Sequence, residues 1–172
     1  MRVLDSCRVS DGEAETTVTL ERPEATDRDV GRWLIEVDLQ TFTENTWSEH
    51  TAQAVARFGA VFLLRAEGLV IGTCACVRSH GEPDTVVLLS MGLMPGWRGR
   101  GLGQWMIGGV LRALTDDGAA AVMLQTSSRS ARARKVYEDV GFVVVERGEL
   151  EADGERDLVL RADLPRAAAS VA

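Results

Sequence analysis

Residues 85–103 read TVVLLSMGLMPGWRGRGLG, an apolar run followed directly by a turn rich in glycine and arginine. The run from Thr85 to Met94 is apolar on both faces, which is typical of a strand in the middle of a sheet. Apolar residues recur at helical spacing from Leu102 onward, so we expect a helix to begin where the turn ends. A strand, a glycine-rich turn and a helix N-terminus in this order can hold an anion, because the first turn of a helix offers unpaired N–H groups and a partial positive charge.

Apolar periodicity on both sides of this turn predicts alternating strands and helices, and therefore an α/β chain. Seven strands are expected at residues 16–22, 60–65, 69–78, 85–94, 119–126, 142–146 and 158–164. Four helices are expected at 27–39, 51–58, 102–117 and 133–140, the first with a capping-box-like start at 26–29. We expect one domain at 15–164, a flexible N-terminal segment at 1–14 and a disordered tail at 165–172, because the two ends lack periodicity.

The charge of the chain argues against several kinds of partner. The formal net charge is −7, so the average surface repels DNA and anionic membranes. Residues 96–135 depart from this average with seven basic and two acidic side chains, a local balance of +5 that suits a small polyanion. This basic cluster is also compatible with the phosphates of tRNA, although the overall acidity disfavours tRNA as a partner.

The cysteines and the N-terminus indicate the compartment. Three cysteines without CxxC spacing predict neither a metal site nor a disulfide. The N-terminus is charged and lacks the apolar core of a signal peptide, and no apolar run approaches about 18 residues. We therefore expect a cytoplasmic protein that needs no metal.

Two motifs narrow the identity of the anion. The glycine-rich turn has no Gly-Lys-Ser/Thr, and Gln104 stands where a dinucleotide-binding loop would have its third glycine. The turn instead matches the pattern Arg/Gln-x-x-Gly-x-Gly/Ala through Arg98, Gly101 and Gly103. Residues 130–142, SARARKVYEDVGF, closely match a second pattern, Asn-x-x-Ala-x-x-Leu-Tyr-Glu-x-x-Gly-Phe. With both motifs in this order, the chain resembles the GNAT superfamily of acetyl-CoA-dependent N-acetyltransferases.

This resemblance implies the GNAT fold, a twisted central sheet that is mixed but mostly antiparallel, with about seven strands and four helices. It implies that acetyl-CoA is the co-substrate, that Tyr137 faces the departing sulfur, and that the N–H of Leu93 polarises the thioester carbonyl. The residues that it assigns to acetyl-CoA binding are Met91, Gly92, Leu93, Arg98, Gly99, Arg100, Gly101, Leu102, Gly103, Gln104, Ser130, Arg132 and Ala133. Ser130 departs from the family's usual Asn, and a homodimer is typical of the family.

The base for the acceptor amine is where the sequence departs most from this family. Many members have a Glu on the strand before the loop, but residues 88–91, LLSM, contain no carboxylate. The amine must still lose a proton, because an ammonium has no lone pair with which to attack. We expect deprotonation through ordered water that contacts Ser90 or an acid such as Glu44, with Glu49 and Asp84 as alternatives.

The acceptor itself is not identified by the sequence. Four acidic residues in or near the first two helices would suit a cationic amine: Glu36, Asp38, Glu44 and Glu49. Three aromatic residues there are candidate walls of an acceptor pocket: Trp33, Phe42 and Trp47.

The leading function is direct acetyl transfer to a primary amine of a small molecule or a peptide. A noncatalytic coenzyme A binding module is one alternative, favoured by the missing strand carboxylate and opposed by the presence of Tyr137. The other alternative is a transferase of the same fold that uses a longer acyl-CoA or an aminoacyl-tRNA.

Overall fold

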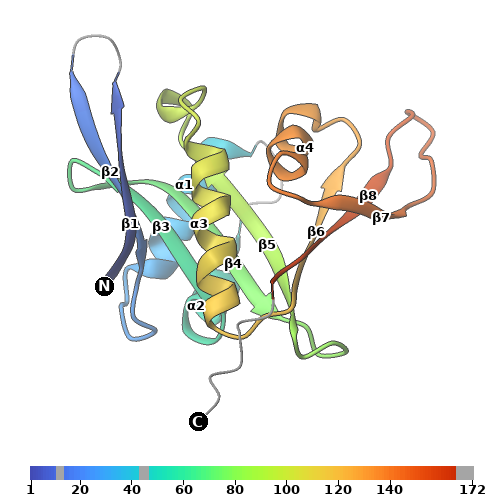
Figure 1. Ribbon diagram of the computed structural model, residues 1–172, viewed down its shortest axis with the longest axis horizontal. Helices are drawn as coiled ribbons and strands as arrows, with labels where there is room; N and C mark the ends of the chain where they lie inside the picture. The colour runs from blue at the N-terminus through green and yellow to red at the C-terminus, as the bar shows by residue number, and fades with distance from the viewer. Residues whose placement is uncertain (11–13, 43–46, 166–172) are drawn as a thin grey trace.

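Residues 1–10, 14–42 and 47–165, which the computed structural model describes, form one sheet of eight strands in the order β1-β2-β3-β4-β5-β6-β8-β7 (Figure 1). The strands are β1 (Arg2–Ser10), β2 (Glu15–Arg22), β3 (Ala60–Ala66), β4 (Leu69–Arg78), β5 (Thr85–Leu93), β6 (Ala121–Ser127), β7 (Val143–Arg147) and β8 (Asp157–Asp163). The helices are α1 (Val30–Thr41), α2 (Glu49–Phe58), α3 (Leu102–Asp116) and α4 (Ala131–Glu138), with a short 3-10 helix at Pro95–Trp97.

In this described sheet, β5 and β6 are the only parallel neighbours, and every other pair is antiparallel. A parallel pair needs a crossover connection, which α3 supplies. The expected class is therefore confirmed: an α/β fold with four helices and a mixed, mostly antiparallel sheet. The described sheet has eight strands, one more than the seven segments expected from the sequence.

The additional strand is β1, in a segment that we expected to be flexible. It pairs with β2 from Arg2↔Arg22 to Ser10↔Glu15, so the expectation for the first 14 residues was wrong over residues 2–10. None of the β1 side chains is fully buried, because the strand lies at the edge of the sheet. A half-buried edge strand does not need a large apolar side chain at every second position. The alternation of apolar and polar residues that predicts a strand is therefore missing here. The expected tail lies almost wholly outside the described residues.

Helices cover both faces of the sheet and bury two separate cores. The core beneath α3 and α4 includes Phe62 and Leu64, whereas the core beneath α1 and α2 includes Val61 and Leu63. These four residues alternate along β3, because successive side chains of a strand point to opposite faces. No helix in the described part of the chain is long and apolar enough to cross a membrane.

Helix α1 begins three residues later than the sequence predicts, at Val30. The side chain of Asp27 accepts a hydrogen bond from the N–H of Asp29 at 3.0 Å, so it forms a turn before the helix and does not cap it. Asp29 occupies the N-cap position without a side-chain capping bond. The helix continues to Thr41, which places Asp38 inside its last turn.

Two adjacent glycines in α3 allow a test of how closely this helix packs against β2. A Cβ added at Gly109 would overlap Cδ2 of the fully buried Leu20, whereas one at Gly108 would meet only the flexible end of Arg112, at 3.6 Å. We expect Gly109→Ala to lower the free energy of unfolding by about 1–3 kcal/mol through overpacking. Gly108→Ala is the matched control and should raise it by about 0.5–1 kcal/mol through helix propensity. Urea denaturation measures both changes, and equal effects would contradict close packing at Gly109.

Candidate active site

Strands β5 and β6 pair for only part of their length. Their register runs from Thr85↔Ala121 to Leu88↔Leu124 and stops there, although both strands continue. Beyond that point β5 pairs with β4 alone and β6 with β8 alone. The two strands therefore diverge toward the end of the sheet where α4 and the loop before α3 lie (Figure 1).

A β-bulge lies at the point where the strands part. Ala75 of β4 faces Ser90 and the next residue, Cys76, faces Leu88, so Leu89 has no counterpart on β4. A bulge bends its strand and increases the local twist, which favours divergence of β5 from β6. The edge of residues 89–93 that faces β6 has no strand partner in the described chain, and such an edge can pair with an extended ligand.

The glycine-rich loop connects the end of β5 with the N-terminus of α3. Gly99 and Gly101 have φ angles of 80° and 76°, a region that favours glycine, and a Cβ at either would meet nothing within 4 Å. The first hydrogen bond of α3 joins the N–H of Trp105 to the carbonyl of Gly101, so the N–H groups of residues 102–104 precede it. The loop thus offers both donors and room for a diphosphate.

Arg98 and Arg100, which the family resemblance assigns to acetyl-CoA, lie in different surroundings. Arg98 Nε donates to the carbonyl of Leu93 at 2.9 Å and its Nη2 to the carbonyl of Thr41 at 3.5 Å. Its guanidinium therefore ties the loop to β5 and α1. The guanidinium of Arg100 lies 5.2 Å from the ring centroid of Trp97, a cation–π contact that leaves its N–H groups available.

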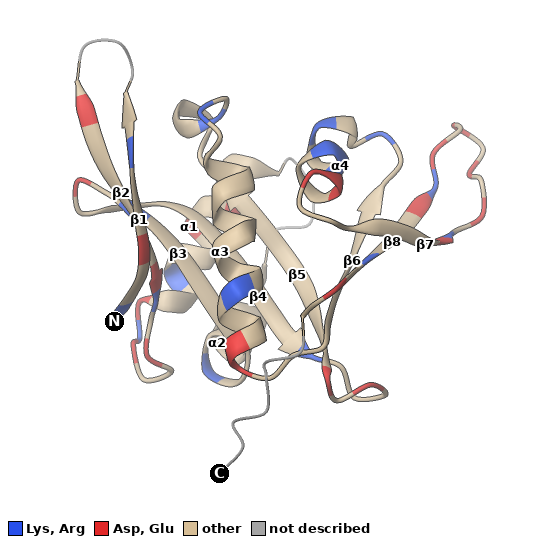
Figure 2. Ribbon diagram, viewed as in Figure 1, with Lys and Arg blue, Asp and Glu red and all other residues tan. Residues whose placement is uncertain are grey.

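Part of the predicted basic cluster is neutralised by nearby acids. Lys135 pairs with Asp139 at 3.0 Å, and Arg129 pairs with Asp153 at 3.0 Å. Arg98, Arg100, Arg132 and Arg134 have no ion pair within 4 Å among the residues described. Figure 2 shows basic residues of the loop and of α4 at one end of the molecule, so the remaining positive charge lies on both sides of the opening between β5 and β6.

A pocket of about 500 Å³ lies where these two strands part. The described residues that line it come from all four surrounding parts of the chain, namely α1 with α2, β5, β6 and α4. They are Asp38, Phe42, Trp47, Ser48, Thr51, Leu88, Leu89, Ser90, Met91, Gln125, Thr126, Ser130, Ala133 and Tyr137. The fold thus brings Ser90, Tyr137 and two of the three candidate aromatic walls into one pocket.

Other candidates from the sequence lie elsewhere. Trp33, the third aromatic residue, packs against the core beneath α1 and α2. Glu49 is exposed in the first turn of α2. Asp84 is exposed in the turn before β5, at the opposite end of that strand from Ser90. Glu44 lies outside the described residues.

Asp38 is the one carboxylate among the described residues that line the pocket, and it is only 3% exposed. Its Oδ1 accepts hydrogen bonds from Trp47 Nε1 at 3.2 Å and from Ser90 Oγ at 3.3 Å. Its Oδ2 is buried without a hydrogen-bond partner in the described chain. Burial raises the pKa of Asp38, although the hydrogen bonds from Ser90 and Trp47 act in the opposite direction. A carboxylate with a raised pKa accepts a proton more readily at neutral pH.

From the sequence, Asp38 was expected only as one of the acids that suit a cationic acceptor. The overlooked signal was helical spacing, because Val30, Leu34 and Asp38 recur every four residues and share the buried face of α1. A charged group on an apolar helix face is costly, so its presence there makes Asp38 a candidate for a functional role. Its partner Ser90 is 52 residues away in the chain, and no sequence pattern linked the two.

Tyr137 lies on the buried side of α4 and is 7% exposed. Its ring packs edge-on against Phe142, with the ring centroids 5.5 Å apart. Burial raises the pKa of Tyr137, and the nearby thiols of Cys74 and Cys76 raise it further. The phenol therefore keeps its proton at neutral pH and can donate a hydrogen bond to a developing thiolate.

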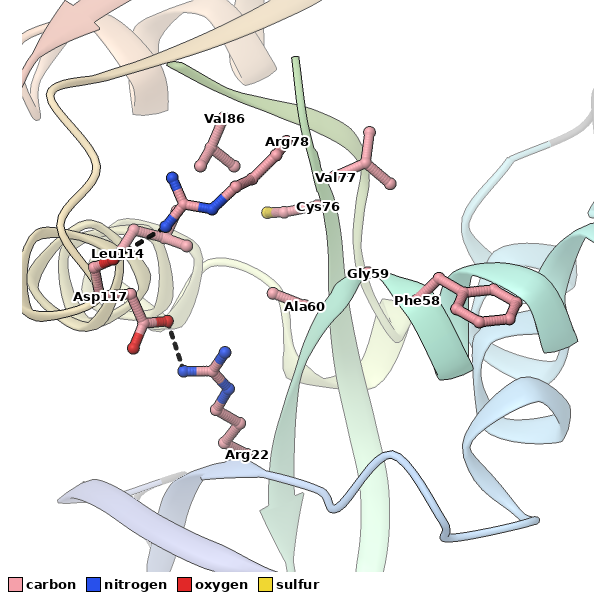
Figure 3. A pocket seen from close by; sticks show the side chains of 10 residues that line it. All are labelled: Arg22, Phe58, Gly59, Ala60, Cys76, Val77, Arg78, Val86, Leu114 and Asp117. Atoms are coloured by element: carbon pink, nitrogen blue, oxygen red, sulfur yellow. Dashed lines mark hydrogen bonds and ion pairs between the residues drawn. The ribbon is translucent and has the colours of Figure 1, made fainter. Parts of the chain in front are cut away.

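A second hollow, of about 460 Å³, lies between the end of α3 and strands β2 and β4 (Figure 3). Arg22 Nη1 donates to Asp117 Oδ2 at 2.5 Å, and Arg78 Nη2 donates to the backbone carbonyl of Asp117 at 2.8 Å. These charged groups satisfy one another and tie α3 to the sheet. The charged groups of this hollow therefore hold the fold together, and the hollow is not a candidate active site.

Comparison with known proteins finds similarity in sequence to one family and to individual acetyltransferases. A model of the acetyltransferase (GNAT) family matches residues 23–142. An uncharacterized N-acetyltransferase from Mycobacterium tuberculosis is 29% identical over 107 residues, which cover 61% of this chain and 67% of that protein. N-acetylaspartate synthetase from Homo sapiens is 36% identical over 76 residues, which cover 44% of this chain and 25% of that protein.

Solved structures share the fold. The ribosomal-protein-S18-alanine N-acetyltransferase from Escherichia coli has a TM-score of 0.75 at 19% identity, over 90% of this chain and 99% of that chain. A putative streptothricin acetyltransferase from Bacillus anthracis, in complex with acetyl coenzyme A, has a TM-score of 0.56 at 16% identity, over 63% of this chain and 64% of that chain. At such low identities these likenesses concern the fold alone.

Gly103 allows a test of the phosphate loop. A Cβ at this position would meet only Cγ1 of Val136, at 3.9 Å, so a larger residue is compatible with folding. A side chain there would obstruct a diphosphate on the first turn of α3, and Gly103→Val should weaken coenzyme A binding at least about tenfold. Calorimetric titration measures the affinity, with Gly108→Ala in the same helix as the control. Unchanged affinity in a folded Gly103→Val protein would show that the loop does not bind the coenzyme.

Proposed function

Since the chain belongs to the acetyltransferase (GNAT) family, we propose that it transfers the acetyl group of acetyl-CoA directly to a primary amine. The pocket between β5 and β6 is the observation that carries this proposal. It holds Asp38, Ser90 and Tyr137 beside the unpaired edge of β5. A proton acceptor, a proton donor and a site for an extended thioester are thus adjacent, as amine acylation requires.

The chain fits acetyl-CoA in two consecutive places. Residues 102–104 offer backbone N–H groups to the diphosphate, and the open space at the loop glycines leaves room for it. The unpaired edge of residues 91–93 suits the amide groups of pantetheine, which would direct the thioester toward Tyr137. Bound there, acetyl-CoA supplies an activated acyl group, and the N–H of Leu93 is the candidate donor to its carbonyl oxygen.

The pocket also favours one class of amine. Asp38 is the only charged residue among its described lining, and no Lys or Arg lines it. An amine that enters as an ammonium would be attracted to Asp38, whereas a carboxylate on the acceptor would have no cationic partner. Phe42 and Trp47 offer aromatic surface for an apolar body. We therefore propose a primary amine whose neighbouring carbon carries no carboxylate, unlike the aspartate implied by the name of the human relative.

A matched pair of acceptors tests this proposal. 2-Phenylethylamine and phenylalanine differ by one carboxylate, and we expect at least about tenfold higher kcat/KM for the amine, or 1.4 kcal/mol. Release of the coenzyme A thiol with a panel of amines and amino acids measures the rates. Equal or faster reaction with phenylalanine would contradict the acceptor class. Absence of thiol release with every amine, despite coenzyme A binding, would favour a noncatalytic module.

Replacing Tyr137 with Phe removes the hydroxyl and keeps the ring contact with Phe142. Because the phenol stabilises charge that develops on sulfur, we expect kcat to fall about 10- to 1000-fold with coenzyme A affinity changed by no more than a few-fold. Steady-state kinetics and calorimetric titration measure the two quantities. Normal turnover in Tyr137→Phe would assign Tyr137 to packing alone.

A further inference from the structure

Asp38 and Ser90 form a connected pair between the interior and the pocket. Asp38 is 3% exposed, and its Oδ2 is inaccessible as well as unpartnered in the described chain. Ser90 is half-buried, lines the same pocket and donates its hydroxyl proton to Asp38 Oδ1 at 3.3 Å. An acceptor amine in the pocket would therefore meet the hydroxyl of Ser90 before it met the carboxylate.

We propose that Asp38 is the terminal proton acceptor for the acceptor ammonium, and that the proton reaches it through the hydroxyl of Ser90. This inference rests on the proposed acetyl transfer and adds a defined base to it. It replaces the expected water relay without a dedicated base. The 3.3 Å separation is long for a hydrogen bond between oxygens, and we expect it to shorten when an ammonium binds at Ser90.

In the proposed step, the acceptor loses its protons in two stages, one before it attacks the thioester and one after. The ammonium gives one proton to Ser90 Oγ while Ser90 gives its own proton to Asp38 Oδ1. The free electron pair on nitrogen forms the N–C bond while the π pair of the thioester carbonyl moves onto its oxygen. That pair then re-forms the C=O bond as the C–S bond breaks with its electron pair on sulfur. A second nitrogen proton reaches that sulfur, directly or through the hydroxyl of Tyr137, and Asp38 releases its proton to solvent. The products are the amide and the free thiol of coenzyme A.

Asp38 faces no competing charge that would take over this role. Strands β5 and β6 contribute no charged side chain between residues 85 and 93 or between 121 and 127. Tyr137 on α4 keeps its proton, and Arg98 is held by the carbonyls of Leu93 and Thr41. Glu49 and His50 at the start of α2 are exposed. Within the described chain, Asp38 has no ion pair within 4 Å.

The pH dependence of kcat/KM with 2-phenylethylamine tests the relay. In the wild type, kcat/KM should rise with pH as Asp38 loses its proton, because burial raises the pKa of this carboxyl, and should then level off well below the pKa of the amine, because the ammonium itself is a substrate. Asp38→Asn and Ser90→Ala should each lower kcat/KM about 100-fold or more near pH 7. In both variants only the neutral amine reacts, so kcat/KM should keep rising with pH until the pH reaches the pKa of the amine.

A double-mutant cycle distinguishes a relay from two independent contributions. The combined Asp38→Asn, Ser90→Ala enzyme should be no more than a few-fold slower than either single variant, because removing either partner breaks the same path. Glu36→Gln is the matched control. Glu36 was a candidate for attracting a cationic amine, but it does not line the pocket: it is exposed on the same helix and pairs with Arg32 at 3.7 Å. Near wild-type rates in Ser90→Ala, or multiplied losses in the double variant, would overturn the relay.

Thermal unfolding supplies a readout independent of turnover. Burial penalises the charged carboxyl, so the penalty is absent below its ordinary pKa and fully present above the raised pKa. Asp38→Asn removes the penalty and keeps an acceptor for Trp47. Its melting temperature should therefore equal or exceed that of the wild type near about pH 8, and the difference should shrink toward about pH 4. A lower melting temperature at the higher pH would make Asp38 a structural residue and overturn the proposal.

Failure of this inference can be told apart from failure of the proposed function. A wild-type enzyme that releases no thiol with any amine would refute the acetyl transfer itself. An active wild type whose pH profile persists in both variants would refute the Asp38–Ser90 relay alone.

Discussion

The end of pairing between β5 and β6 after Leu88 and Leu124 is the constraint on which the site depends. Backbone N–H and C=O groups beyond that point forgo each other's hydrogen bonds, which a sheet interior would normally supply. The protein retains the arrangement because each strand keeps its outer neighbour, β4 for β5 and β8 for β6. The bulge at Leu89 adds local twist where the strands part. The opening is therefore bordered on each side by a strand that remains paired with its outer neighbour, β5 with β4 and β6 with β8.

The pocket in this opening lowers the stability of the fold, because it requires a buried carboxylate at Asp38. Asp38 occupies the buried face of α1, where an apolar side chain would pack against the sheet without loss of hydration. Two hydrogen bonds to Oδ1 offset part of that loss, and Oδ2 is left without a partner in the described chain. The same burial that disfavours the charge also raises the pKa of the carboxyl, which gives it the affinity for a proton that the proposed relay needs.

The reaction and the acceptor of this protein depend on different features of the molecule. The family match indicates acetyl transfer in general, and the solved structures show a shared fold. The acceptor depends on the few side chains that line the pocket, and these come from α1, α2 and the ends of β5 and β6. A fold can be shared at 19% identity while those lining residues change. The chemistry of the described lining is therefore the more direct guide to the amine.

The sequence by itself determined what is local along the chain. The strand, glycine-rich loop and helix from Thr85 to Asp116 were predicted nearly to the residue, because apolar period and glycine position act within a few residues. Only the tertiary structure decided that Asp38 meets Ser90 across 52 residues, since that contact depends on how α1 crosses the sheet and on the register of β5. The structure also added β1, whose pairing with β2 supplies the order that its own side chains do not encode. Contacts between distant elements follow from packing geometry, and a periodic pattern specifies the face of each element but not its neighbour.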